Sequence, residues 1–309
     1  MKILVLGGCG FIGSHVVDAL LRDGHEIRIF DRNEESFRLA LPSVEYRLGD
    51  FTDQAAVRDA VEGMEAVFHL VSTTFPSTAA LDPKRDVREN LLGTQQLVEA
   101  MLDANVSRLL FLSSGGTVYG ITETVPIDET HPLRPINSYG ITKVAIESYL
   151  EMYRRTRGLS PIIIRASNPF GPRQGHTGVQ GVVATFLNQI VNGAAVEVWG
   201  DGSVVRDYVF VRDLARFCAL AGASRKEGVY NAGSGRGTSL VELLAAMEDV
   251  TGRAFERRFK PAPATDVPVS VLDCSAALET FNWSAETDML TGLQETWDWI
   301  MGLNLGSKN

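Results

Sequence analysis

The segment Ile3-Leu4-Val5-Leu6-Gly7-Gly8-Cys9-Gly10-Phe11-Ile12-Gly13 decides the fold of this chain. Its four apolar residues predict a short buried strand, and the spacing of apolar residues over 13–22 predicts a helix directly after the glycines. Gly7, Gly10 and Gly13 permit a tight turn and a close approach of the backbone to a pyrophosphate, and the helix N-terminus adds N–H donors. The segment therefore predicts a loop that binds a dinucleotide.

The alternation of strand and helix continues through the first half of the chain. Short β-branched runs predict strands at 3–6, 26–30, 44–48, 66–71, 109–113 and 161–165. Helical spacing of apolar residues predicts helices at 13–22, 54–61, 86–104 and 139–157. This order favours an α/β fold with a doubly wound parallel sheet of the Rossmann type, covered by helices on both faces.

After Arg165 the pattern changes to loops rich in Gly, Pro and Asn. Helices are predicted at 182–192, 212–221, 240–250 and 290–301, with short strands at 196–199 and 208–211 and a Pro-rich bridge at 260–268. We expect a Rossmann domain over 1–165 and mainly a smaller C-terminal substrate-binding lobe over 166–309, with some segments returning to the first domain.

Composition and charge narrow the possible functions. The chain has 309 residues, 45% of them hydrophobic, and a formal net charge of -9, which argues against nucleic acid as a partner. No segment reaches the roughly 18 uninterrupted apolar residues that a membrane span requires. Cys9, Cys218 and Cys274 have no metal-ligand or redox spacing, so we expect no metal site and a reducing, cytoplasmic location.

Two carboxylates follow predicted strands and favour one cofactor. Asp31 ends the second strand, where it can accept both hydroxyls of an adenosine ribose, and it would repel a 2′-phosphate. It therefore favours NAD over NADP, although Arg32 is adjacent and a capping role is the alternative. Asp50 follows the third strand and is placed to reach an adenine amino group, or to make an ordinary turn.

A second motif, Tyr139-Gly140-Ile141-Thr142-Lys143, supplies a base for hydride chemistry. Tyr139 and Lys143 lie one helical turn apart, so Lys143 can lower the pKa of the tyrosine and hydrogen-bond the nicotinamide ribose. The alternative is a casual Tyr–Lys pair on a surface helix. Together with the glycine loop, the motif indicates redox chemistry.

Ordered motifs along the chain resemble those of the extended short-chain dehydrogenases/reductases, in their nucleotide-sugar epimerase/dehydratase group. The resemblance covers nearly the whole length. Besides the glycine loop and the Tyr139–Lys143 motif, the matches are Asp50, His69-Leu70-Val71-Ser72, Asn90-Leu91-Leu92-Gly93-Thr94, Ser113-Ser114 with Val118-Tyr119-Gly120, Asn168-Pro169-Phe170-Gly171-Pro172, and Gly200-Asp201-Gly202 with Arg206-Asp207-Tyr208-Val209.

The resemblance implies the residues that contact NAD. They are Gly7, Gly10, Phe11, Ile12, Gly13, Asp31, Arg32, Asp50, Phe51, Leu70, Val71, Ser72, Asn90, Ser113, Tyr139 and Lys143. It also implies a nucleotide-sugar substrate that contacts Asn168 and, through a guanidinium fork on the diphosphate, Arg206. The alternatives are a surface ion pair of Arg206 with Asp207 or Asp201, and an Asn-Pro loop opening at Asn168.

The sequence departs from the family pattern at two places. Gly115 occupies the usual position of the catalytic hydroxyl; because strand residues alternate faces, Thr117 is the preferred substitute, with Ser114 as competitor and Ser113 as a possible helper. The bridge Pro263-Ala264-Thr265-Asp266 lacks the arginine common in the family, so one nucleotide contact is missing or supplied differently.

The reaction we expect from the resemblance is 4-epimerisation of a UDP-linked hexose, by transient oxidation at C4. A dehydratase or another NAD-dependent nucleotide-sugar oxidoreductase is the alternative. The resembling dehydratases, however, place an Asp-Glu pair directly after the catalytic Thr, and this chain has Gly115-Gly116-Thr117-Val118 in that region. A dinucleotide sensor or scaffold is the non-enzymatic alternative. The resemblance also implies a homodimer that pairs the helices at 86–104 and 139–157.

Overall fold

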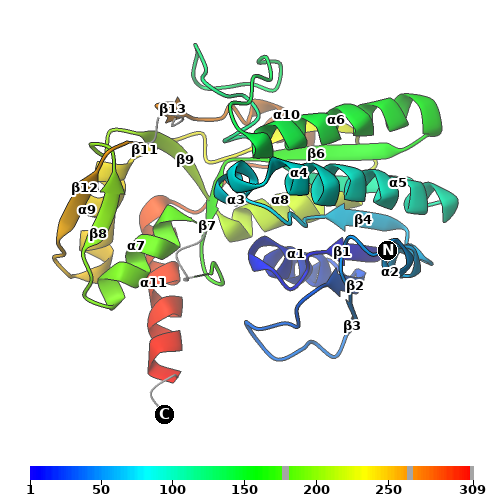
Figure 1. The fold of residues 1–309 in the computed structure, drawn as a ribbon. Coiled ribbons are helices and arrows are strands. Elements are labelled where there is room, and N and C mark those ends of the chain that lie inside the picture. The colour runs from blue at the N-terminus through cyan, green and yellow to red at the C-terminus, as the bar shows by residue number, and fades with distance from the viewer. Residues whose placement is uncertain (176–180, 263–266, 307–309) are drawn as a thin grey trace. The chain divides into compact units, whose positions relative to one another are not determined.

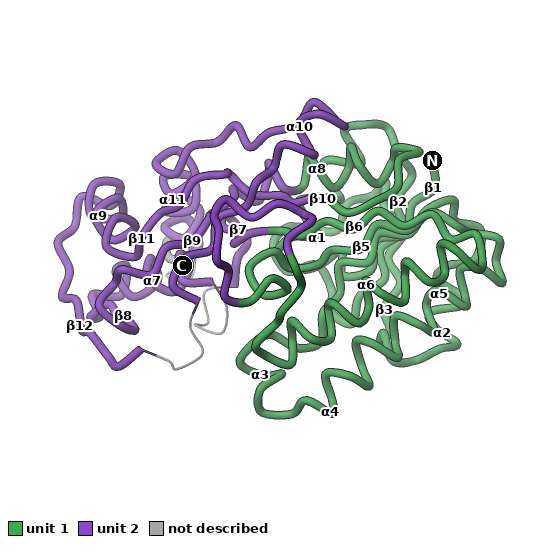
Figure 2. Tube along the Cα trace, turned by 90° about the horizontal axis from the view of Figure 1, so that it is seen from above, with its two compact units in different colours: residues 1–120, 132–166, 215–230 green, residues 121–131, 167–214, 231–309 purple. Residues whose placement is uncertain are grey.

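The computed structural model of the protein describes residues 1–175, 181–262 and 267–306 (Figure 1). The chain divides into two units, coloured separately in Figure 2. Unit 1 contains Met1–Gly120, Pro132–Ala166 and Ala215–Tyr230. Unit 2 contains Ile121–His131, Ser167–Leu214 and Asn231–Asn309. Each unit therefore consists of three separate stretches of the sequence.

Unit 1 is built on a seven-stranded sheet in the order β10-β6-β5-β4-β1-β2-β3. The strands are β1 (Lys2–Leu6), β2 (Glu26–Asp31), β3 (Val44–Leu48), β4 (Ala66–His69), β5 (Arg108–Ser114), β6 (Ser160–Ala166) and β10 (Gly228–Ala232), the last of which crosses the boundary between the units along the chain. All pairings from β3 to β6 are parallel. The predicted doubly wound sheet is confirmed, with β1 inside it between β2 and β4.

Helices cover both faces of this sheet, because its strands are apolar on both sides. On one face, α2 (Gln54–Val61), α5 (Gly93–Asp103) and α6 (Ser138–Arg157) share a core with alternate strand residues such as Leu4, Leu6, Val67 and Phe111. The other face carries α1 (Phe11–Arg22) and the end of α8 (Val211–Ala223), where Gly222 lies against Phe68 and Leu110. Figure 2 shows α5 and α6 on one side of the strands and α8 on the other.

Two predicted boundaries in unit 1 are wrong. The strand expected at 66–71 ends at His69, which leaves Leu70–Ser72 in a loop. The helix expected from Asp86 begins earlier, as α4 (Pro83–Asp86), because Asp82 caps it through Arg85 N and Pro83 fits its first position. A π-helical segment, η1 (Val87–Leu92), connects α4 to α5, and a short helix, α3 (Pro76–Leu81), precedes them.

Unit 2 contains two small sheets and four helices among its described residues. In one sheet β9 (Val205–Phe210) pairs with β7 (Asn168–Phe170), β11 (Gly237–Ser239) and β13 (Val269–Ser270); in the other β8 (Val196–Trp199) pairs with β12 (Arg257–Lys260). The helices are α7 (Val182–Val191), α9 (Leu240–Thr251), α10 (Ser275–Phe281) and α11 (Met289–Gly306). The strand predicted at 208–211 begins three residues earlier, at Val205.

The core of unit 2 is separate from that of unit 1. Phe170, Phe210 and Trp297 pack with side chains of α7, α9 and β8. Within the described parts of the chain, no helix has the length and apolarity that a bilayer crossing would need.

Candidate active site

The glycine loop joins β1 to α1 in a conformation that only glycine accommodates. Gly7 has φ of +83°, and its N–H donates to the carbonyl of Phe30 at 2.9 Å. A Cβ atom at Gly13 would lie 1.9 Å from the carbonyl oxygen of Gly7, so no larger residue fits there. The backbone of the glycine loop therefore packs directly against the start of α1.

The N-terminus of α1 fits the pyrophosphate of a dinucleotide. Gly10 is its N-cap and makes no side-chain capping hydrogen bond. The N–H groups of Phe11, Ile12 and Gly13 stand in the first turn, where a helix has no internal acceptors for them. With no acidic residue in that turn, the positive end of the helix dipole is uncompensated and favours an anion.

Asp31 ends β2 beside the glycine loop. Its Oδ2 accepts a hydrogen bond from Cys9 N at 3.1 Å, and its Oδ1 accepts one from Asn33 N at 3.1 Å. The side chain is partly exposed, while Arg32 is fully on the surface. Asp31 does not cap a helix; it fixes the loop and leaves further lone pairs on both oxygens for a ligand.

Asp50 and Phe51 directly follow β3, and their side chains have different surroundings. Asp50 Oδ1 accepts hydrogen bonds from Thr52 N at 2.8 Å and Thr52 Oγ1 at 2.7 Å, and these bonds hold the pKa of Asp50 below its ordinary value. The Phe51 ring is in the core, 5.0 Å from the ring centroid of His69. Phe51 can therefore offer a ligand only its main chain.

The loop after β4 lies against the glycine loop. A Cβ atom on Gly7 would be 3.2 Å from Val71 Cγ2. β1 has β2 on one side and β4 on the other, so the strand order of the sheet reverses at β1. Ligands of doubly wound sheets bind at the carboxyl ends of the strands where this reversal occurs. The structure thus brings Gly7 and Leu70–Ser72, predicted cofactor contacts, to one place.

Tyr139 is in the first turn of α6, which Asn137 caps by accepting a hydrogen bond from Gly140 N at 2.8 Å. The Ser72 hydroxyl, which donates to the carbonyl of Thr74 at 2.9 Å, lies near enough to the phenol of Tyr139 to affect its pKa. Burial raises the pKa of Tyr139 to about 12; the nearby Ser72 hydroxyl acts in the opposite direction, and the charge of Asp86 adds to the rise. The net shift of this pKa is upward because burial of the phenol dominates, and the expected lowering by Lys143 stays a prediction.

Lys143 is buried on the inner face of α6, so the interpretation as a casual surface pair is wrong. Its Nζ donates to the carbonyl of Leu112 at 2.9 Å and lies 5.6 Å from the centroid of the Tyr139 ring. Burial lowers the pKa of Lys143 to about 8, against the opposing influence of Glu147 and Asp86. The ammonium group therefore stands one turn below Tyr139, at the end of β5.

The hydroxyl candidates lie in a turn and not in a strand. Thr117 N and Val118 N both donate to the carbonyl of Ser114, at 3.2 and 3.1 Å, so the chain curls after β5. The expectation that Gly115 and Thr117 share the face of a strand is wrong for this reason. The turn packs on α6 beside Tyr139, since a Cβ on Gly140 would lie 2.7 Å from the carbonyl oxygen of Thr117.

The three hydroxyls differ in exposure. Ser114 and Thr117 are partly exposed. Ser113 is buried, and its hydroxyl donates to the carboxylate of Glu147. That bond engages the side chain of Ser113 inside the protein, while Ser114 and Thr117 are the two of these three hydroxyls that solvent reaches.

Three buried charged residues of unit 1 are absent from the sequence predictions. Arg165 of β6 pairs with Glu147 of α6, and Asp86 of α4 accepts hydrogen bonds from four side chains. The sequence carried a signal for Glu147, which follows Lys143 by one helical turn on the same face. Asp86 stands likewise one turn before Asn90, a predicted cofactor contact.

The predicted substrate contacts Asn168 and Arg206 lie in unit 2, whereas every other predicted site residue lies in unit 1. Asn168 Nδ2 donates to the carbonyl of Asp207 at 2.9 Å, which fixes β7 to β9. Arg206 Nη1 donates to the carbonyls of Val205 and Val267, at 3.0 and 2.5 Å. The segment 263–266, where the family arginine is missing, lies outside the described residues.

The carboxylates considered as ion-pair partners of Arg206 have other hydrogen-bond donors. Asp207 is fully buried and accepts hydrogen bonds from the backbone N–H groups of Ser234, Gly235 and Leu272. Asp201 accepts from Ser203 N at 2.9 Å. In the described parts of the chain, no cluster of three or more His, Cys, Asp or Glu side chains could hold a metal ion.

Comparison with known proteins identifies what the chain resembles. Residues 3–233 match the model of the NAD dependent epimerase/dehydratase family. The UDP-glucose 4-epimerase of Mycolicibacterium smegmatis is 36% identical in an alignment of 304 residues that covers 96% of this chain and 97% of that protein.

Two crystal structures resemble the fold over nearly the whole chain. One is the UDP-glucose 4-epimerase of Thermotoga maritima with UDP-glucose, with a TM-score of 0.93, 34% identity, and coverage of 98% of this chain and 100% of that one. The other is the UDP-glucose 4-epimerase of Thermus thermophilus in complex with NAD, with a TM-score of 0.91, 35% identity, and coverage of 98% and 99%.

Proposed function

The chain belongs to the NAD dependent epimerase/dehydratase family, and on that premise we propose that it is an NAD-dependent UDP-hexose 4-epimerase. Relatives and solved structures that resemble it over nearly their whole length are UDP-glucose 4-epimerases. The observation that carries the proposal is the cluster of Ser72, Tyr139 and Lys143 beside a loop that fits a dinucleotide.

Unit 1 would hold the cofactor, and unit 2 would contribute the contacts to the nucleotide. The glycine loop and the N-terminus of α1 would bind the pyrophosphate, Asp31 the adenosine ribose, and Lys143 the nicotinamide ribose. Asp50, Leu70–Ser72 and Asn90 would surround the rest of the dinucleotide. Asn168 and Arg206 would bind the diphosphate of the UDP-sugar.

In the reaction, Tyr139 would remove the proton of the C4 hydroxyl and return it at the end of the cycle. NAD, when bound, would supply reversible acceptance of a hydride for the C4 carbon. Lys143, held by the carbonyl of Leu112, would place a positive charge near the phenol. Thr117 or Ser114 would hydrogen-bond the substrate oxygen, and no Asp-Glu pair follows them for elimination of water.

The direct test is incubation of the purified protein with a panel of UDP-, dTDP- and GDP-sugars, followed by mass spectrometry and NMR. The proposal expects a UDP-hexose product of unchanged mass with inverted configuration at C4. Loss of one water from the substrate would identify a dehydratase instead. Bound NAD without turnover of any sugar would favour a dinucleotide sensor.

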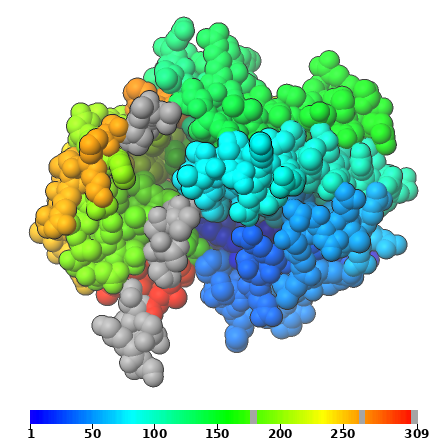
Figure 3. Space-filling view, viewed as in Figure 1, coloured from blue at the N-terminus to red at the C-terminus, as the bar shows by residue number. Residues whose placement is uncertain are grey.

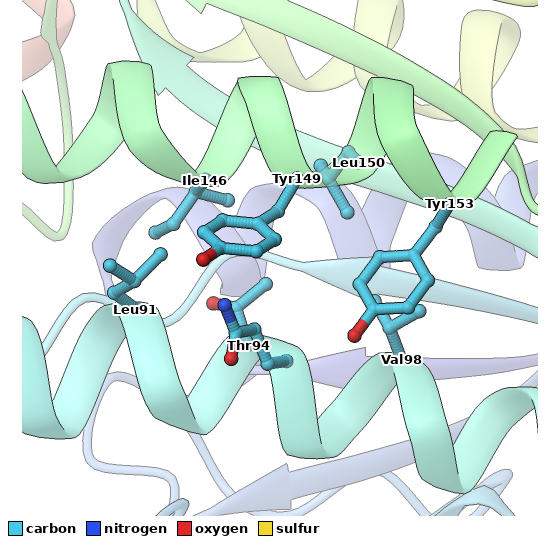
Figure 4. A pocket seen from close by; sticks show the side chains of 8 residues that line it. Leu91, Thr94, Val98, Ile146, Tyr149, Leu150 and Tyr153 are labelled. Atoms are coloured by element: carbon cyan, nitrogen blue, oxygen red, sulfur yellow. The ribbon is translucent and has the colours of Figure 1, made fainter. Parts of the chain in front are cut away.

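We also propose that the protein forms a homodimer through the outer faces of α5 and α6. A shallow groove between these helices is lined by Leu91, Thr94, Gln95, Val98, Ile146, Tyr149, Leu150 and Tyr153 (Figure 4). Tyr149 and Met152 on this face are each 40% exposed, and Leu92 is 44% exposed. Light scattering across a concentration series should give twice the monomer mass; a monomer throughout would contradict the dimer.

A cytoplasmic location is the remaining part of the proposal. Cys9, Cys218 and Cys274 are free thiols, and Cys9 and Cys218 are buried. A reducing compartment suits free thiols. Cell fractionation with an antibody against the protein tests the location, and recovery in an oxidising compartment would contradict it.

A further inference from the structure

The carboxylate of Asp86 is fully buried at the end of α4 and accepts four side-chain hydrogen bonds. Its Oδ1 accepts from Thr74 Oγ1 at 2.6 Å and from Asn90 Nδ2 at 2.9 Å. Its Oδ2 accepts from Ser138 Oγ at 3.0 Å and from Thr142 Oγ1 at 2.8 Å. Burial of a carboxylate is unfavourable unless its lone pairs are satisfied, and here donors meet both oxygens.

These donors come from the segments that surround Tyr139. Ser138 directly precedes Tyr139 in the first turn of α6, and Thr142 follows it in the next turn. Thr74 belongs to the loop after β4, and its carbonyl accepts the hydroxyl of Ser72 in the same loop at 2.9 Å. Asn90 is tied to that loop as well, since its Oδ1 accepts from Thr73 N at 2.9 Å.

The elements that Asp86 joins meet within unit 1. In Figure 3 the cyan atoms of the α3–α4 region lie beside the green atoms of α6, and the residue contacts between α4 and α6 agree. Asp86 itself has no exposure to solvent. A single side chain therefore connects the start of the helix that carries Tyr139 to the two segments that line the predicted cofactor site.

We propose that Asp86 is a positioning residue, which holds the first turn of α6 and the Tyr139 phenol against the loop after β4 and acts on Tyr139 and Lys143 through its buried charge. The part that concerns turnover rests on the proposed function. The part that concerns the phenol itself does not, because the hydrogen bonds are present whatever the protein's substrate is.

The charged groups around this turn define what removal of Asp86 should do. The negative charge of Asp86 raises the pKa of both Tyr139 and Lys143. Glu147 also faces Lys143 and is itself paired with Arg165, and His69 of β4 is held neutral by burial. Loss of the Asp86 charge should therefore lower the pKa of both groups, with Glu147 unchanged.

Both changes move the pH dependence in one direction. The active form needs Tyr139 ionised and Lys143 protonated, so the two limbs of the rate profile report the two ionisations of this pair. Because both groups would lose a proton at lower pH without the Asp86 charge, both limbs should move to lower pH. A role limited to packing would lower the rate at every pH and leave the limbs in place. The direction of the limbs thus separates the two roles.

Asp86→Asn is the main variant. The amide oxygen can still accept from Thr74 and Asn90, while the hydroxyls of Ser138 and Thr142 can rotate to accept from the amide NH2. We expect kcat to fall by about tenfold. We also expect both limbs of the pH–rate profile to move down by about one pH unit, because the lost charge acts at short range inside the protein. Asp82→Asn, at the exposed cap of α4, removes a charge nearby and should change neither quantity.

Two further measurements keep the inference testable if Asp86→Asn folds poorly or no sugar is converted. Ser138→Ala combined with Thr142→Val removes two hydrogen bonds without a change of charge; kcat should fall with KM nearly unchanged and with both limbs in place. Unchanged kcat in this variant would overturn the positioning role.

Ultraviolet difference absorbance of tyrosinate measures the phenol directly, with Tyr139→Phe in each background to assign the signal. Tyr139 should titrate at lower pH in Asp86→Asn than in the unaltered protein. An unshifted titration would overturn the electrostatic role, whatever the activity. A shifted titration in a protein that converts no nucleotide sugar would instead contradict the proposed function alone.

Discussion

Arg165 and Glu147 form a buried ion pair in unit 1, with Arg165 Nη2 and Glu147 Oε2 2.7 Å apart and both side chains almost completely enclosed. Arg165 Nη1 also donates to the hydroxyl of Tyr119 at 3.0 Å, and Glu147 accepts from Ser113. The pair therefore connects β6, α6 and the end of β5 directly behind Lys143.

Removal of one partner should destabilise the protein strongly, because the other charge stays buried without compensation. Arg165→Met or Glu147→Gln should lower the free energy of unfolding by about 3–5 kcal/mol, measured by urea unfolding. The double variant should recover part of this loss. Arg155→Met, which removes an exposed partner of Glu151, is the control and should cost no more than about 1 kcal/mol. Equal effects in both pairs would contradict the prediction.

Replacement of Tyr139 by Phe should abolish turnover and leave the fold intact. The phenol is the proposed base, and loss of general base catalysis typically reduces rates by about 10²–10⁴. NAD binding, followed by calorimetry, should persist because the ring remains. Undiminished turnover would refute the base assignment, whereas loss of NAD binding would show a structural role for the hydroxyl.

Gly13→Ala should weaken dinucleotide binding. The added methyl group would lie 1.9 Å from the carbonyl oxygen of Gly7, so the loop and the start of α1 must separate. We expect the dissociation constant for NAD to rise at least about tenfold, equivalent to about 1.4 kcal/mol. Gly302→Ala, in α11 with open space around it, is the matched control. An unchanged affinity in Gly13→Ala would argue that the loop does not contact the ligand.

Asp31→Asn should shift cofactor preference toward NADP. The carboxylate would repel a 2′-phosphate, and the amide would not, while an oxygen remains to accept from Cys9 N. The ratio of the affinities for NAD and NADP should fall about tenfold. Asp23→Asn, at the opposite end of α1, should leave the ratio unchanged. A constant ratio in both variants would exclude Asp31 as the discriminating group.

His69 should make the protein acid-sensitive. It is buried with Nε2 2.9 Å from Thr94 Oγ1, and burial lowers its pKa to about 3. Between the ordinary value of 6.5 and about 3, the unfolded chain binds a proton that the folded protein does not. Stability should therefore fall as the pH drops through this range, and His69→Gln should show a smaller slope in urea unfolding. His131→Gln is the control; equal slopes in all three proteins would contradict the role of His69.

The parallel sheet and its helices could be predicted because their signals are local. Three local patterns predict elements that the structure contains: the glycines after β1, the β-branched runs, and the helical spacing of apolar residues over 54–61. The early start of α4 was missed although Asp82 and Pro83 carry its signal, since the apolar periodicity begins only later. The short strands of unit 2 depend on pairing partners distant in sequence, which periodicity does not reveal.

The residues of the candidate site were easier to predict from the sequence than the burial and the charges around them. Tyr139 and Lys143 are recognisable by spacing, but the pKa of each depends on burial and on nearby carboxylates such as Asp86, which only the tertiary packing brings near. The curl after Ser114 likewise follows from backbone hydrogen bonds and not from the residue pattern. Replacing Thr117 and Ser114 one at a time would show which of the two hydroxyls is needed for turnover.

The chain completes its first sheet late during synthesis on the ribosome. The end of α8 and the first residues of β10 belong to unit 1, yet they follow residues 167–214 of unit 2. Until residue 230 has emerged, β6 has an unpaired edge and Phe68 and Leu110 lack their cover from Gly222. A fragment that stops at residue 165 should therefore aggregate through this unpaired edge.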